Sequence, residues 1–556
     1  MTYRKSLIGT FAAVLSLTLA VPALASQDTP AKSPGAEAAH VSESAVHGEA
    51  HSHADSLVPK QAMLLPGYGN GGFAITTAVS QAQAFFSNGM ELGPAFAHNA
   101  AIAAMKEAVR LDPSCAMCLW GQTLVEGPTI NYGKDAAERT PLYIQAQQAR
   151  KMAKRDGTLR EQALTKALVL RYRPGQDVGK HDRAYAKAMR GLIEDYPQDN
   201  SIAILAADAA MVAARSEAEV GLAIPLIETV LARAPNDTPA IHFYIHASEI
   251  IGKSAQAEPY ADRLAGLAPN ASHLVHMPSH TFYWVGRYQD AASTNLRAVE
   301  LGIANAKRLG LKGPEGVWGL PYHAHNVIFG LGGALMAGDA EIGLILARPL
   351  VQRSATGEAA EPVSQLLAAA GYYALARFDS PVAVLALPEP KLPYLKAAWH
   401  YARGEVLAGR GDVAGIETEL AAIPATLRVP KLPGKAGKRA KQTKDQKAES
   451  PAPEQMLGIT RAVLQGRVAM LQGRPADAAK AFTAGAEIEE TEDFGRFSDP
   501  PAFWYPVRRD VAVALLAAGD AVGAQRELQA SLKLRPKDPT ALYLMREVDA
   551  ALRLKN

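Results

Sequence analysis

The chain is rich in Ala and Leu, and runs in which apolar and polar residues alternate are scarce. Alternation with a period of two is the pattern of a half-buried strand, so its scarcity argues against a large sheet. Aromatic residues make up only 6% of the chain, which fits helices packed through small side chains. The pattern therefore predicts an all-α fold.

Small residues recur with a period of about 34 residues over most of positions 80–550. The clearest repeat carries them at its eighth, twentieth, twenty-seventh and thirty-second places, which are Gly89, Ala101, Ala108 and Pro113. Two later stretches match at Gly466, Ala478 and Gly485 and at Gly519, Ala524, Leu528 and Pro536. Small side chains at these places let the two helices of a repeat approach closely, and such helix pairs stack into an α-solenoid.

The first 25 residues (1–25) are predicted to be a cleavable signal peptide. Arg4 and Lys5 precede the apolar run 7–21, and the small residues at 23–25 are typical of a cleavage site. The run is shorter than the roughly 20 residues that a membrane-spanning helix needs. We therefore expect a periplasmic or secreted protein, with no transmembrane segment in the mature chain.

Composition divides the remaining residues into four segments. Residues 26–60 contain almost no large apolar side chains, so we expect a disordered leader, which carries His40, His47, His51 and His53. Residues 430–455 are rich in Lys and Pro, which favours a solvated basic linker. The helical repeats then occupy 61–429, where the histidines concentrate, and 456–556.

Charge and motifs argue against several classes of function. The formal net charge is only +3, so the sequence shows no electrostatic footprint for nucleic acid. No Gly-x-Ser-x-Gly, Walker or dinucleotide fingerprint occurs in a strand-to-helix setting, which argues against a nucleotide cofactor. Two cysteines allow at most one disulfide, so the fold must depend on helix packing.

Two histidine pairs stand out among the repeats. His242 and His246 are four residues apart, and the same pair recurs one repeat later as His276 and His280. Residues four apart lie on one helix face with Cβ atoms about 5–6 Å apart, so two imidazoles can share a cation. Because the two helices would be neighbours, we expect the four imidazoles to converge on a metal site.

Other side chains near the pairs add candidate ligands. These are Glu249, His273, His323 and His325. The set suits Zn, Cu or Fe, since imidazole binds all three. The alternative interpretation is that the histidines line a groove and make local hydrogen bonds without a metal.

Cys115 and Cys118 lie where one repeat ends and the next begins. No His follows Cys118 directly, so the motif is not a c-type haem site. Because the predicted compartment is oxidising, we favour a disulfide that cross-links the turn between the two repeats. A redox-active thiolate at a helix N-terminus remains the alternative.

These features together resemble the tetratricopeptide-repeat (TPR) family. The Cys-x-x-Cys-x-Trp-Gly motif at 115–121 and the His-x-x-His-Met-Pro-Ser-His motif at 273–280 are similar to those of a branch of exported bacterial TPR proteins. The resemblance implies a TPR-like α-solenoid whose concave groove, lined by the first helix of each pair, commonly takes a peptide. It implies no reaction.

Three functions remain open at this point. The first is a metalloprotein, which would be an enzyme if Glu249 served as a ligand or as the general base to a metal-bound water. The second is an interaction module whose groove holds a protein or peptide partner. The third is metal storage or delivery, in which the histidines of the leader collect the ion.

Overall fold

The computed structural model describes residues 62–312, 316–320, 322–357, 361–427, 451–495 and 502–553. Within these ranges every regular element is a helix, and no strand occurs. The prediction of an all-α solenoid of stacked helix pairs is therefore confirmed. The predicted signal peptide, the leader and residues 430–450 of the predicted linker lie outside the described residues.

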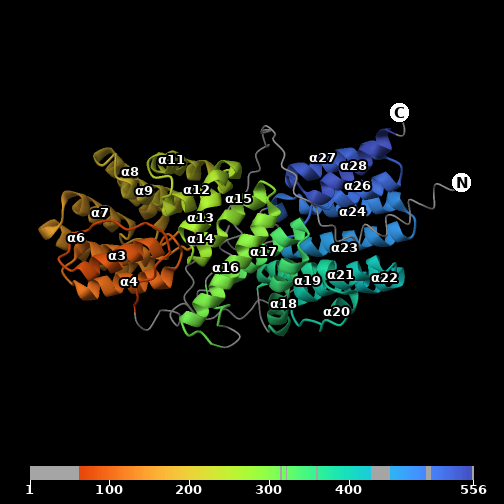
Figure 1. The fold of residues 1–556 in the computed structure, drawn as a ribbon, viewed down its shortest axis with the longest axis horizontal. Coiled ribbons are helices and arrows are strands. Elements are labelled where there is room, and N and C mark those ends of the chain that lie inside the picture. The colour runs from red at the N-terminus through yellow and green to blue at the C-terminus, as the bar shows by residue number, and fades with distance from the viewer. Residues whose placement is uncertain are drawn as a thin grey trace.

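The helices follow one another along an elongated molecule, from α3 at one end to α22 and α28 at the other (Figure 1). The N-terminal helices are α3 (Ser80–Leu92), α4 (His98–Leu111), α5 (Ala116–Val125), α6 (Ala136–Asp156), α7 (Leu159–Arg171), α8 (Val178–Asp195) and α9 (Asn200–Ala213). Neighbours in sequence pack as antiparallel pairs, among them α3 with α4 and α8 with α9.

The central helices surround the candidate site. They are α10 (Glu217–Val220), α11 (Ile224–Arg233), α12 (Thr238–Ile250), α13 (Glu258–Leu267), α14 (Ser272–His276), α15 (Pro278–Trp284), α16 (Tyr288–Arg308) and α17 (His323–Ala337). Two short 3-10 helices, η2 (Gly221–Ala223) and η3 (Ser254–Ala257), precede α11 and α13.

The C-terminal helices form a second stack (Figure 1). They are α18 (Ala340–Thr356), α19 (Pro362–Phe378), α20 (Pro381–Leu385), α21 (Pro393–Gly409), α22 (Val413–Ala422), α23 (Ala452–Leu471), α24 (Pro475–Glu489), α25 (Glu492–Gly495), α26 (Arg508–Ala517), α27 (Ala521–Leu534) and α28 (Pro539–Arg553). Helix α23 begins at Ala452, inside the range predicted as linker. Pro453 lies in its first turn, where proline is tolerated. Residues 452–455 of the predicted linker thus belong to α23.

Capping residues fix where many of these helices begin. Asp135 and Thr158 form capping boxes with the Glu three residues later, which satisfies backbone N–H groups of the first turns of α6 and α7. Asp237 caps α12 in the same position by accepting from the Ala240 N–H at 2.9 Å.

The small residues of the repeat are the points of closest helix approach. A Cβ on Gly89 would lie 2.7 Å from Met105 Cε, and one on Gly466 would lie 2.2 Å from Phe482 Cε1. Any larger side chain there would force the paired helices apart. The spacing seen in the sequence therefore reports the packing of α3 against α4 and of α23 against α24.

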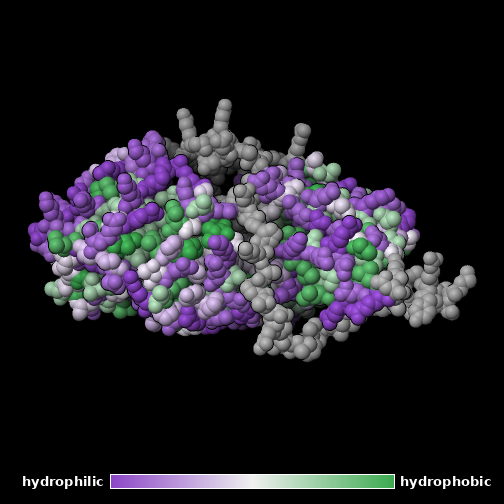
Figure 2. Space-filling model, turned by 90° about the horizontal axis from the view of Figure 1, so that it is seen from above, coloured by the Kyte–Doolittle hydropathy of each residue, from purple (hydrophilic) through white to green (hydrophobic). Residues whose placement is uncertain are grey.

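The surface mixes polar and apolar residues. Hydrophilic side chains spread over both ends of the face in Figure 2, with separate hydrophobic patches between them. Among the described residues, no helix combines the length and the hydropathy that crossing a membrane requires.

Candidate metal centre

Helix α12 holds the first histidine pair in its buried core. His242 is fully buried and His246 is 3% exposed. Their Nε2 atoms are 3.0 Å apart, so the two rings point at each other one helical turn apart, as the spacing predicts.

The second pair bridges two short helices. His276 ends α14 and His280 lies in α15, which Pro278 opens after a break at Met277. The expectation of one continuous helix was wrong here, because proline cannot donate the hydrogen bond that would continue it. The backbone of Met277 is nevertheless helical (φ −50°, ψ −38°), so the imidazoles still face each other with Nε2 atoms 2.9 Å apart.

Two further histidines complete two sets of three. His273 on α14 places Nε2 3.1 Å from His242 Nε2, and His325 on α17 places Nε2 3.0 Å from His276 Nε2. Within each set the facing nitrogens lie within 4.8 Å of one another. We call these set 1 (His242, His246 and His273) and set 2 (His276, His280 and His325).

The two sets are neighbours in space. The ring centroids of His246 and His280 are 5.6 Å apart, and those of His273 and His276 are 5.7 Å apart. All six histidines are less than 5% exposed. The structure thus brings the four predicted histidines together but divides them, one pair to each set.

Hydrogen bonds behind set 2 define which nitrogens carry protons. The Asn295 side chain donates from Nδ2 to the Ala291 carbonyl at 2.7 Å, which turns its Oδ1 toward His276 Nδ1 at 2.6 Å. His276 must therefore donate from Nδ1. His280 Nδ1 likewise lies 2.7 Å from a Glu249 carboxylate oxygen, which accepts only.

This arrangement directs lone pairs at one another. With the proton on Nδ1, the Nε2 of a neutral imidazole is an acceptor, so His276 and His280 bring two acceptors to 2.9 Å. His325 adds a third nitrogen at 3.0 Å from His276 Nε2. One proton can be shared by only one pair of these facing nitrogens, whereas one metal ion can bind all three.

Burial keeps the His242 and His273 rings of set 1 neutral. It lowers the pKa of His242 to about 3 and holds the pKa of His273 well below its usual value, and the neighbouring histidines add to the effect at His273. Neutral imidazole is the form that binds a metal, so no proton has to be displaced at neutral pH.

Two predicted ligands lie elsewhere. Glu249 stands behind His280 and accepts from His280 Nδ1 and from Trp284 Nε1, the latter at 2.9 Å, so it orients a histidine and does not join the facing nitrogens of set 2. His323 belongs to neither set, because its ring packs edge-on against Trp318 at 4.8 Å.

Aromatic side chains that the sequence did not single out cover both sets. Phe329, in the middle of α17, lies 4.6 Å from His280 and 5.1 Å from His276 between ring centroids. Phe96 covers set 1 at 4.6 Å from both His242 and His273. Phe96 and Tyr322 have φ of 53° and 67°, which is unusual for such large side chains and was not visible in the sequence.

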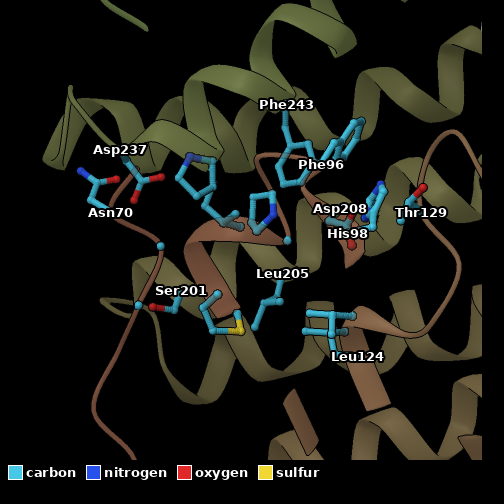
Figure 3. Close-up of a pocket in the computed structure, with 18 of the residues that line it drawn as sticks. Asn70, Phe96, His98, Leu124, Thr129, Ser201, Leu205, Asp208, Asp237 and Phe243 are labelled. Atoms are coloured by element: carbon cyan, nitrogen blue, oxygen red, sulfur yellow. The ribbon is translucent and has the colours of Figure 1, made fainter. Parts of the chain in front are cut away.

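Two cavities flank Phe96. Cavity A, of about 120 Å³, is lined by Met90, Phe96, His98, Arg171, Asp208 and Phe243, among others. Figure 3 shows it with Asn70 and Asp237 at one end and Thr129 at the other. Cavity B, of about 110 Å³, shares Phe96 and His98 with cavity A and is lined also by Tyr68, His273, Arg308, Tyr322 and His323.

Cys115 and Cys118 are joined by a disulfide at the N-terminus of α5. Both are buried, and Cys115 Sγ also accepts from the Cys118 N–H at 3.0 Å. The bond lies in the turn between α4 and α5, away from the histidines.

Comparison of the sequence with protein-family models and with curated proteins gives no match. Solved structures that match include yeast Tom70 (11% identity, 86% of this chain and 90% of that chain, TM-score 0.26). The Cut9–Hcn1 hetero-tetramer of the APC/C matches at 13% identity over 84% of this chain and 76% of that chain, with a TM-score of 0.29. The P58(IPK) TPR domain matches at 12% identity over 85% of this chain and 99% of that chain, with a TM-score of 0.22. These scores are too low to carry an argument, so the description of this chain rests on its own geometry.

Proposed function

We propose that this protein is a metalloprotein that holds two transition-metal ions, one on each histidine set. The observation that carries the proposal is the convergence of Nε2 atoms at 2.9 to 3.1 Å in each set, with the lone pairs of His276 and His280 directed at each other. The two facing acceptors of His276 and His280 repel each other at 2.9 Å unless a cation lies between them. Two adjacent sets on neighbouring helices then make a dinuclear centre.

The donor set narrows the metal to copper, zinc or iron. All six ligands are imidazoles, and neither set contains a carboxylate or a thiolate. Hard ions such as Mg²⁺ and Ca²⁺ prefer oxygen ligands and are disfavoured. Among divalent ions at nitrogen sites copper binds most tightly, so geometry and supply would decide between copper and zinc.

Residues behind the ligands fit the role of a metal centre. Asn295 and Glu249 hold the His276 and His280 rings with Nε2 inward, which is how outer partners orient metal-bound histidines. Phe96 packs against set 1 and Phe329 against set 2. A metal with three protein ligands keeps a position for a substrate or water and supplies Lewis acidity or redox chemistry there.

Metal analysis of untagged protein tests the proposal. We expect about two equivalents of metal per chain, and the double variant His246→Ala/His280→Ala, with one ligand removed from each set, to lose both while its helical content stays unchanged. A matched control is His400→Ala, because His400 pairs with Glu419 far from the sets. Wild-type protein that binds no metal at micromolar concentration, or a double variant that keeps both ions, would refute it.

The metal-free outcome would favour an interaction module, since helix-pair arrays of this kind commonly offer a groove to a partner peptide. Storage or delivery of the metal would instead require the leader. Deletion of residues 26–60 should slow metal loading in that case and leave it unchanged for a resident centre.

We also propose that the protein is exported. The buried Cys115–Cys118 disulfide is consistent with the oxidising compartment that the predicted signal peptide implies. Sequencing of the N-terminus of the mature protein tests this, and a protein that begins at Met1 would contradict it.

A further inference from the structure

We propose that cavity B binds a small aromatic carboxylate and delivers it to histidine set 1. The proposal rests on the proposed function in one respect only, that this ligand is the substrate of the metal centre. The ligand site itself stands on the lining of the cavity.

Cavity B reaches the candidate centre directly. The His273 ring forms part of its wall, next to Tyr322, whose ring centroid is 4.4 Å away. The lining of cavity A includes none of the six histidines. A molecule in cavity B is therefore in contact with a ligand of set 1, whereas one in cavity A is not.

The walls of cavity B favour a flat ring. Aromatic side chains surround it, contributed by Tyr68, Phe96, His98, His273, Tyr322 and His323. Phe96 and Tyr322 are stacked with centroids 5.7 Å apart, an arrangement that a further ring can extend. The volume of about 110 Å³ is close to the roughly 150 Å³ of a protein cavity that accommodates benzene.

Arg308 supplies the charge that selects an acid. It is exposed at the rim of cavity B and donates from Nη2 to the Tyr68 hydroxyl at 3.1 Å and to Asn305 Oδ1 at 2.9 Å. Within the part of the chain that the structure describes, it has no carboxylate partner. A guanidinium bound only to neutral groups retains its preference for a carboxylate.

His323 offers a second polar contact inside cavity B. It is 4% exposed, and its Nδ1 has no hydrogen-bond partner among the described residues. Gly302 faces this nitrogen, since a Cβ there would lie 3.0 Å from it. A buried polar atom without a partner is costly, and a polar substituent on a bound ring would satisfy it.

Benzoate is the probe for the test, measured by ligand-detected NMR on wild-type protein and on Arg308→Gln. We expect saturable binding to the wild type and at least about tenfold weaker binding to the variant, the usual loss for one charged hydrogen bond. Arg297→Gln is the matched control, because Arg297 is exposed on the same helix but does not line the cavity, and its affinity should not change.

Experiments on metal-loaded protein distinguish the proposed ligand site in cavity B from the proposed metal centre. In protein loaded with Cu²⁺, the ring protons of bound benzoate should relax much faster than in protein loaded with Zn²⁺, because the cavity adjoins set 1. Arg308-dependent binding to a protein that takes up no metal would support the ligand site and refute the metal centre. No saturable binding, equal affinity in Arg308→Gln, or no paramagnetic effect in copper-loaded protein would overturn the proposal.

Discussion

The proton positions on His276 and His280 are each set by a hydrogen bond behind the ring. Glu249 and Asn295 accept from the Nδ1 atoms of His280 and His276, so both rings present Nε2 to the centre. Neither contact is implied by the spacing of histidines, because the partners lie on other helices. The direction in which each of these two histidines presents its lone pair therefore depends on the acceptor behind the ring as well as on the histidine itself.

Glu249→Gln should remove metal from set 2 and spare set 1. The amide cannot accept from both His280 and Trp284 as the carboxylate does, so the His280 ring loses its orientation and some basicity. We expect the affinity of one of two metal equivalents to fall about 10- to 100-fold, measured by competition with a chelator.

The control for this change is Glu228→Gln. Glu228 accepts a hydrogen bond from the Tyr244 hydroxyl but belongs to neither histidine set. Equal loss of both equivalents, or no loss in Glu249→Gln, would show that Glu249 does not act through His280.

Helices α16 and α17 determine whether set 2 has a third ligand. Gly333 on α17 lets the backbones touch, since a Cβ there would lie 2.6 Å from the Ala292 amide nitrogen and 3.0 Å from the Tyr288 carbonyl oxygen. His325 lies on the same helix, two turns earlier. The close approach of the two helices therefore holds His325 beside His276.

Gly333→Ala should lower both stability and metal binding by set 2. The methyl group meets backbone atoms that can yield only if α17 moves, which typically costs about 1–3 kcal/mol. We expect a lower melting temperature and weaker binding of one metal equivalent, measured by calorimetry and metal titration.

The same substitution at Gly191, in the C-terminal part of α8, is the control. A Cβ there meets nothing within 4 Å, so Ala should stabilise the protein by roughly 0.5–1 kcal/mol through its helix propensity. A similar response at both positions would contradict the assigned role of Gly333.

Across the whole molecule, the last repeats pack back onto the central helices. The Tyr288 hydroxyl donates to the Pro536 carbonyl at 2.9 Å, and the Arg535 guanidinium lies 5.4 Å from the Trp284 ring centroid. Gly286, between α15 and α16, faces the same turn, with Pro536 O 2.2 Å from where a Cβ would be. The C-terminal stack thus packs against the helices that carry the second histidine pair and helps to hold them in place.

Gly286→Ala should destabilise the protein more than Gly252→Ala. The two glycines occupy equivalent places in successive repeats and both have positive φ, 79° and 67°, so Ala pays a similar backbone cost of about 1–2 kcal/mol at each. Only at Gly286 does the methyl group also clash with the C-terminal turn. Chemical denaturation measures the difference, and equal free energies of unfolding would show that the contact contributes little.

The sequence by itself determined the helices and much of the candidate site. Small residues at regular spacing specify where helices must touch, and histidines four apart share a helix face, because both relations are local in the chain. Tertiary structure alone decided the rest. His273 and His325 join different sets, Glu249 lies behind His280, and Phe96 and Tyr322 adopt backbone conformations that no pattern encodes. These features depend on how helices distant in sequence are placed against one another, which is fixed by packing and not by local spacing.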